Sequence, residues 1–176
     1  MKYLLYLFTI FILFILTVVL QPLFSIYGAF PNLLLLFVLV LSIFKDKDYS
    51  FLFVAFVSGL FLDSYYGSLF GGYMFSFLFL SVGFHILSNY FFSIGLSLKS
   101  WAPFILGSIA LFYLLFWIYS NFLVFLNLED FTLSIQGNFI SILIEAFYSL
   151  FVSYLIYKLV EYLKYVNLKY LSTKKF

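Results

Sequence analysis

Six apolar runs, separated by short polar connections, dominate this sequence. Runs of this kind indicate an integral membrane protein of the helical class. We expect an all-α fold with six transmembrane helices in a single polytopic domain, residues 1–176. The expected spans are residues 3–21, 31–44, 49–63, 73–92, 101–126 and 138–160. The first run is longer than the apolar region of a signal peptide, so we expect it to remain as a span.

The composition excludes several classes of protein. Only 9% of the residues are charged and 66% are hydrophobic, whereas a soluble domain carries roughly 25% charged residues. An ordinary soluble enzyme, a disordered chain and a soluble nucleic-acid binder are therefore excluded. The chain has no cysteine, which rules out disulfides and thiolate metal sites. We expect no metal site and no cofactor.

The positions of the lysines predict the orientation of the spans. All of the cationic side chains are lysines, and with six spans they all fall on the side of the two termini. The opposite loops contain Asp63, Glu129 and Asp130 and no lysine. Loops rich in lysine remain in the cytoplasm. We therefore expect both termini to be cytoplasmic.

The second and third runs are short for transmembrane helices. Each has about 14 residues, which gives roughly 21 Å of helix, against a hydrocarbon core of about 30 Å. Such helices must pack against other helices, thin the bilayer or form a re-entrant hairpin. Pro31 is expected at the first helical position of the second span, where its missing N–H costs nothing.

One polar stripe is predicted in the sixth span. Glu145 lies among apolar residues, and the polar residues around it recur at intervals of three or four: Asn138, Ser141, Ser149 and Ser153. Such spacing places them on one face of a helix. An ionisable residue at membrane depth is a candidate for a ligand or proton site. The alternative is a helix-packing seam, in which small serines allow close approach.

His85 is the only histidine of the chain. Ser81, Ser88 and Asn89 share its helix face. A single histidine without a nearby carboxylate does not make a metal site. Pairing with Glu145 is disfavoured, because the expected depths of the two residues differ by roughly 8 Å. We expect a packed, hydrogen-bonded histidine.

A segment rich in glycine and aromatic residues follows the third span. It begins at Asp63 and is expected to form a loop as far as Gly72. Gly59, Gly67 and Gly71 allow tight turns and close helix contact. Asp63 is a candidate for capping the next span or for binding a partner. The segment lacks the lysine and hydroxyl residues of a P-loop.

Motifs of catalysis are missing from the sequence. It contains no HExxH, no GxSxG, no paired intramembrane aspartates and no arginine to hold a lipid phosphate. An intramembrane enzyme would have to rely on Glu145, His85 and Asp63, which belong to three different spans. We therefore expect a protein that is not an enzyme.

One further pattern consists of the start Pro31-Asn32-Leu33, a charged turn, and the motifs Gly59-Leu60-x-x-Asp63 and Gly67-x-x-x-Gly71. With this pattern, part of the chain shows a resemblance: it resembles the rod shape-determining protein family MreD. It implies a multi-pass scaffold of the bacterial cytoplasmic (inner) membrane that supports side-wall peptidoglycan synthesis. The implied partner is MreC, with MreB, RodA and its penicillin-binding protein as further partners, alongside membrane lipids and without nucleic acid. Pro31, Gly59, Asp63, Gly67 and Gly71 are then motif residues.

The resemblance also implies a fold similar to the S component of energy-coupling-factor transporters. This leaves a vitamin-binding S component as the alternative function. It predicts a polar pocket, open to the outside, around Glu145 and the loop at Gly67. S components usually carry alanines in the first span, and this span has none.

Overall fold

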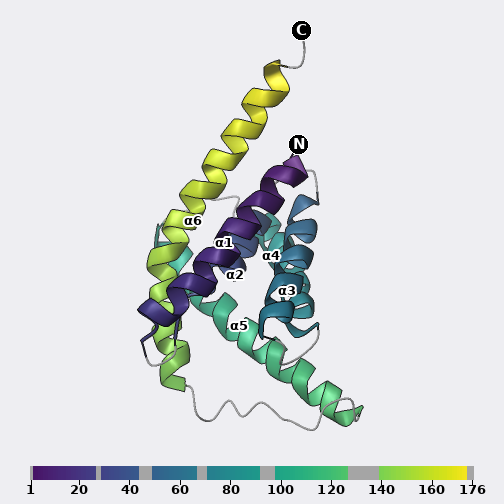
Figure 1. Ribbon diagram of the computed structural model, residues 1–176, viewed down its shortest axis with the longest axis vertical. Helices are drawn as coiled ribbons and strands as arrows, with labels where there is room; N and C mark the ends of the chain where they lie inside the picture. The colour runs from purple at the N-terminus through teal and green to yellow at the C-terminus, as the bar shows by residue number, and fades with distance from the viewer. Residues whose placement is uncertain are drawn as a thin grey trace.

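The computed structural model describes residues 2–26, 29–43, 49–66, 71–91, 98–126 and 139–173. Within these ranges the chain forms α-helices and no strand; one isolated bridge joins Ile26 to Ala29. The helices pack as a bundle (Figure 1). Their bounds are α1 Lys2–Phe24, α2 Leu33–Ile43, α3 Ser50–Tyr66, α4 Gly72–Phe91, α5 Leu98–Phe125 and α6 Phe139–Thr173.

Three of these helices contain stretches that are long and apolar enough to cross a membrane. These stretches are Tyr3–Phe24, Pro103–Phe125 and Ile140–Tyr165. Their large apolar side chains point outward in many places, as Leu4 in α1, Phe125 in α5 and Phe151 in α6 are 74%, 81% and 82% exposed. An outer surface of this kind is stable only in an apolar surrounding. The structure therefore agrees with an integral membrane protein.

The short helix α2 lies at the centre of the bundle. All of its 11 residues are buried, and α1, α3, α4 and α6 surround it. A helix of this length reaches only roughly 16 Å, so it would leave a lipid-facing gap at the periphery. Packing against other helices is therefore how this short run is accommodated, one of the three outcomes expected from its length.

The start of α2 corrects the prediction for Pro31. The helix begins at Leu33, and Asn32 is its N-cap: Leu35 N–H donates to Asn32 Oδ1 over 3.0 Å. An asparagine side chain satisfies a free N–H of the first turn, which proline cannot do. Pro31 thus precedes the cap instead of occupying the first helical position.

Three helices end later than their predicted spans, and α5 begins earlier than predicted, at Leu98. α1 continues through Pro22 to Phe24, α3 continues through Asp63 to Tyr66, and α6 continues to Thr173. Polarity alone does not end a helix, because lysine and leucine are both good helix formers. The predicted loop at Asp63 is therefore wrong at its start. α1 begins and α6 ends at the same end of the molecule, beyond which α6 projects (Figure 1).

Candidate functional site

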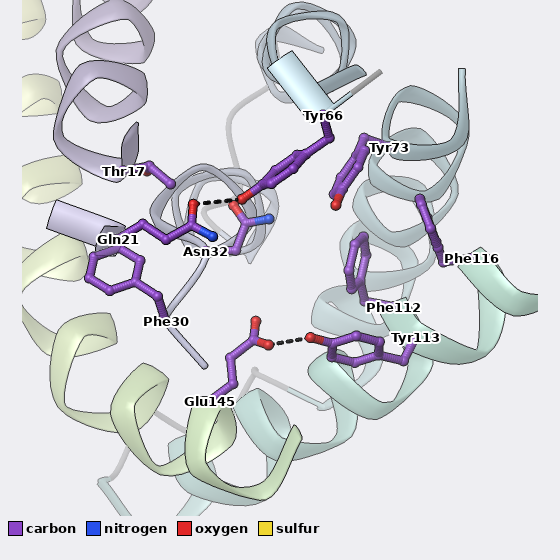
Figure 2. A pocket seen from close by; sticks show the side chains of 10 residues that line it. All are labelled: Thr17, Gln21, Phe30, Asn32, Tyr66, Tyr73, Phe112, Tyr113, Phe116 and Glu145. Atoms are coloured by element: carbon purple, nitrogen blue, oxygen red, sulfur yellow. Dashed lines mark hydrogen bonds between the residues drawn. The ribbon is translucent and has the colours of Figure 1, made fainter. Parts of the chain in front are cut away.

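A cavity of about 170 Å³ lies near the end of the bundle where α1 and α3 end and α2 and α4 begin. Side chains from or next to every helix line it, as Figure 2 shows. The lining residues are Thr17, Gln21, Phe30, Asn32, Tyr66, Tyr73, Phe112, Tyr113, Phe116 and Glu145. The volume is close to the roughly 150 Å³ of an engineered cavity that binds benzene.

Glu145 is the one acidic residue of the cavity wall. It lies in the second turn of α6 and is 7% exposed. The Tyr113 hydroxyl of α5 donates a hydrogen bond to its Oε2. The carboxyl group points into the cavity (Figure 2). Within the described residues, nothing donates a hydrogen bond to the second oxygen, Oε1, which is thus free for a ligand.

The polar stripe of α6 has two parts. Glu145 opens onto the cavity, whereas Ser149 and Ser153 further along the helix are fully buried among other helices. Ser153 donates to the carbonyl of Leu150 over 2.8 Å. Ser141 is partly buried, and Asn138 lies outside the described residues. The stripe faces protein, as expected: it borders a cavity at Glu145 and is packed among the helices at Ser149 and Ser153.

A hydrogen bond between two helices forms the opposite edge of the cavity. Tyr66 at the end of α3 donates through its hydroxyl to Oε1 of Gln21 in α1 over 2.9 Å. The hydroxyl of Thr17, one turn earlier in α1, donates a hydrogen bond to the carbonyl of Leu13 over 2.8 Å. These bonds hold the polar groups of α1 in fixed positions. The cavity is therefore shaped by side chains that already have partners.

Aromatic rings form a continuous wall beside these polar groups. Tyr66 and Tyr73 are stacked, with ring centroids 5.3 Å apart and an interplanar angle of 19°. Tyr73 in turn contacts Phe116 at 4.9 Å and Phe112 at 5.9 Å. The rings come from α3, α4 and α5. An acid and two amides thus share the cavity with a wall of π systems.

Asp63 caps α4 from outside the helix. Its Oδ1 accepts from Tyr73 N–H at 2.9 Å and its Oδ2 accepts from Met74 N–H at 3.1 Å. These are the second and third residues of α4, and the N-cap position is occupied by Gly71, which has no side chain to cap them. Asp63 therefore performs the capping that was one of its two expected roles.

Gly59 and Gly71 make this junction possible. A Cβ on Gly59 would lie 2.3 Å from Met74 Cα, so α3 and α4 touch backbone to backbone here. Gly71 has φ = 85°, a conformation that favours glycine. The expected close contact at Gly59 is confirmed, and so is the tight turn at Gly71. Gly67 lies outside the described residues.

His85 takes no part in the cavity. Its Nδ1–H donates to the carbonyl of Ser42 in α2 over 3.2 Å, and its ring stacks on Phe51 at 4.5 Å. Ser88 donates to the carbonyl of His85 itself. The packed, hydrogen-bonded histidine is confirmed. Within the described residues, no group of three or more acidic or histidine side chains is placed to hold a metal ion.

The sequence did not reveal the partners of Glu145. Tyr113 looks like one of many aromatic residues in an apolar run, and Tyr66, Tyr73 and Gln21 look like residues of a membrane interface. The hydroxyl and amide groups of these residues were the signal in the sequence that they could line a polar cavity. No sequence pattern shows which of these groups from different helices meet.

Comparison with protein-family models, with curated proteins and with solved structures finds no match to this chain.

Proposed function

We propose that this protein is a non-catalytic scaffold of the bacterial cell-elongation machinery, similar to MreD. It crosses the cytoplasmic membrane six times, has both termini in the cytoplasm and binds MreC. Through MreC it supports side-wall peptidoglycan synthesis, together with MreB, RodA and the penicillin-binding protein of RodA. Membrane lipid surrounds its apolar outer face.

The junction between α3 and α4 is the observation that supports a structural role. Of the residues that carry the resemblance, Gly59, Asp63 and Gly71 meet at this one place. Each serves the packing of the two helices, and both oxygens of Asp63 accept backbone hydrogen bonds. The motif residues therefore build a helix hairpin, which is a structural role and the one that a scaffold needs.

The arrangement of the ends supports the proposed orientation. α1 begins and α6 ends at the same end of the bundle (Figure 1), as an even number of crossings requires. The lysines of the sequence fall on that side under a six-span topology, which agrees with lysine-rich cytoplasmic ends. The cavity then lies toward the outer face of the membrane.

Depletion of the protein and rescue by variants test the scaffold proposal. Depleted cells should become round, and tagged protein should recover MreC from detergent extracts. Gly59→Ala should rescue the shape poorly because it forces α3 and α4 apart, whereas Gly83→Ala should rescue fully, since a Cβ there meets nothing within 4 Å. Cells that stay rod-shaped after full depletion would refute the proposal.

A vitamin-binding S component remains the second candidate, and the cavity is the observation that favours it. Glu145 lines a partly polar cavity, as that function requires. The volume of about 170 Å³ is below the roughly 300 Å³ at which sites for drug-sized ligands begin, which disfavours a vitamin. Mass spectrometry of extracts from purified protein tests this candidate, and a bound vitamin at near-equal molar amount would establish it.

A further inference from the structure

The cavity at Glu145 combines a buried carboxyl group, an open volume and a wall of aromatic rings. A buried carboxyl group that serves only packing should have both oxygens satisfied, because a half-satisfied polar group at depth is costly. One oxygen of Glu145 instead accepts a hydrogen bond from the Tyr113 hydroxyl, and the carboxyl group points into an open volume (Figure 2). When it is ionised, this carboxyl group carries a negative charge at the edge of a cavity that has no basic lining residue.

Among the described residues, no basic side chain lines the cavity beside Glu145. None of the ten lining residues is basic. Lys158 forms an ion pair with Glu161 on the exposed part of the same helix. A buried carboxyl group without a basic partner is either protonated or balanced by a cation that enters its site, so a ligand that binds here as the counter-ion of Glu145 is positively charged.

The aromatic wall indicates which cation fits. Tyr66, Tyr73, Phe112 and Phe116 supply π systems, which attract organic cations through the ring quadrupole. A bare metal ion prefers several oxygen ligands instead, and two of the oxygens here, on Gln21 and Asn32, already accept hydrogen bonds. The volume of about 170 Å³ admits a ligand somewhat larger than benzene.

We propose that this cavity binds a small organic ammonium ion, with Glu145 as the counter-ion and the aromatic residues around Tyr73 as the wall of a cation–π site. Gln21 and Asn32 lie on the facing side and offer amide groups to a polar tail of the ligand. The Tyr73 hydroxyl also points into the cavity (Figure 2). The proposal is independent of the scaffold function, because it depends only on the cavity.

Calorimetry on the full-length protein in nanodiscs tests the proposal. Choline is the probe, and 3,3-dimethyl-1-butanol, its neutral counterpart of nearly equal shape, is the control ligand. Choline should bind saturably and about tenfold or more tighter than the alcohol, since the cation–π and ionic contributions are absent from the alcohol. Equal binding of both, or no saturable binding of choline, overturns the proposal, and this comparison needs no variant.

Two pairs of variants assign the binding to the cavity. Glu145→Gln should weaken choline about tenfold or more, and Glu161→Gln, which changes an exposed acid of the same helix, should not. Tyr73→Leu should weaken choline and leave the alcohol unchanged, whereas Phe79→Leu, an exposed position of α4, should change neither. Undiminished choline binding by folded Glu145→Gln protein overturns the assignment.

The lipid composition of the nanodisc distinguishes two sources of the ammonium group. Discs of phosphatidylglycerol contain no lipid with an ammonium headgroup, so no lipid competes with choline for the cavity. Adding phosphatidylethanolamine should weaken choline binding if a lipid headgroup enters the cavity from the membrane, and should leave it unchanged if the ligand is a free solute. Either result supports recognition of an ammonium group, and the two results name its source.

Discussion

Replacing Gly59 by alanine is expected to separate α3 from α4 at their closest point. The added Cβ would lie 2.3 Å from Met74 Cα and 2.7 Å from Met74 N. Carbon atoms in contact are normally about 3.5–4.0 Å apart, so the helices must move by roughly 1 Å. Both atoms belong to the backbone, and a flexible side chain therefore cannot relieve the clash.

The displacement also affects the cap of α4. Met74 N–H donates to Asp63 Oδ2 over 3.1 Å, and a shift of roughly 1 Å takes this pair beyond hydrogen-bond distance. Overpacking costs about 1–3 kcal/mol and a lost cap about 1 kcal/mol. The helix propensity of alanine returns up to about 1 kcal/mol. We expect a net loss of roughly 2 kcal/mol in the free energy of unfolding.

Thermal unfolding in detergent, followed by circular dichroism, measures this effect. For a chain of this size a loss of that magnitude lowers the melting temperature by roughly 4–8 °C. Gly83→Ala and Gly107→Ala are matched controls, because a Cβ at either helical position meets nothing within 4 Å. Their melting temperatures should stay equal or rise. A Gly59→Ala protein that melts together with these controls would refute the backbone contact between α3 and α4.

Three further predictions concern the cap, the cavity and the topology. Asp63→Ala should lower stability by about 1–3 kcal/mol, since two N–H groups of α4 lose their acceptor. In the same melting assay, the double variant Gly59→Ala, Asp63→Ala should lose less stability than the sum of the two single variants. Tyr113→Phe should lower the melting temperature of the wild-type protein. The same substitution should lower the melting temperature less in Glu145→Gln protein, because the Tyr113 hydroxyl has no charged acceptor there. The chain has no cysteine, so single cysteines can report the topology. Lys47→Cys should react with an impermeant thiol reagent only after the cells are opened, whereas Asp130→Cys should react in intact cells. The reverse pattern would contradict the orientation.

Parts of the candidate site could be predicted because they depend on local spacing. The polar stripe of α6 follows from residues three and four apart, which share a helix face whatever lies opposite. The use of Gly59 in a close helix contact follows from its missing side chain. A role for Asp63 as a cap was expected for the same kind of reason, as carboxylates bind free N–H groups at helix starts.

Other parts depended on distances between helices. Tyr113 and Glu145 lie 32 positions apart in the sequence, and Tyr66 and Gln21 are 45 apart. No periodicity connects such pairs, because their meeting depends on how α1, α3, α5 and α6 cross. The signals of the cavity in the sequence were consequently only Glu145 and scattered hydroxyl and amide groups, which no pattern connects.

The sequence by itself determined the helical, apolar class of the protein, since so few charges cannot cover a soluble surface and long apolar runs need an apolar surrounding. It also determined which helix faces are polar. Only the tertiary structure decided that α2 lies at the centre of the bundle, fully buried, and that a carboxyl group of α6 faces an aromatic wall from α3, α4 and α5. The physical reason is that, within a membrane, apolar helices gain little from hydrophobicity by associating. Their arrangement is set by close packing and by a few polar contacts, which depend on the complementary shapes of distant segments.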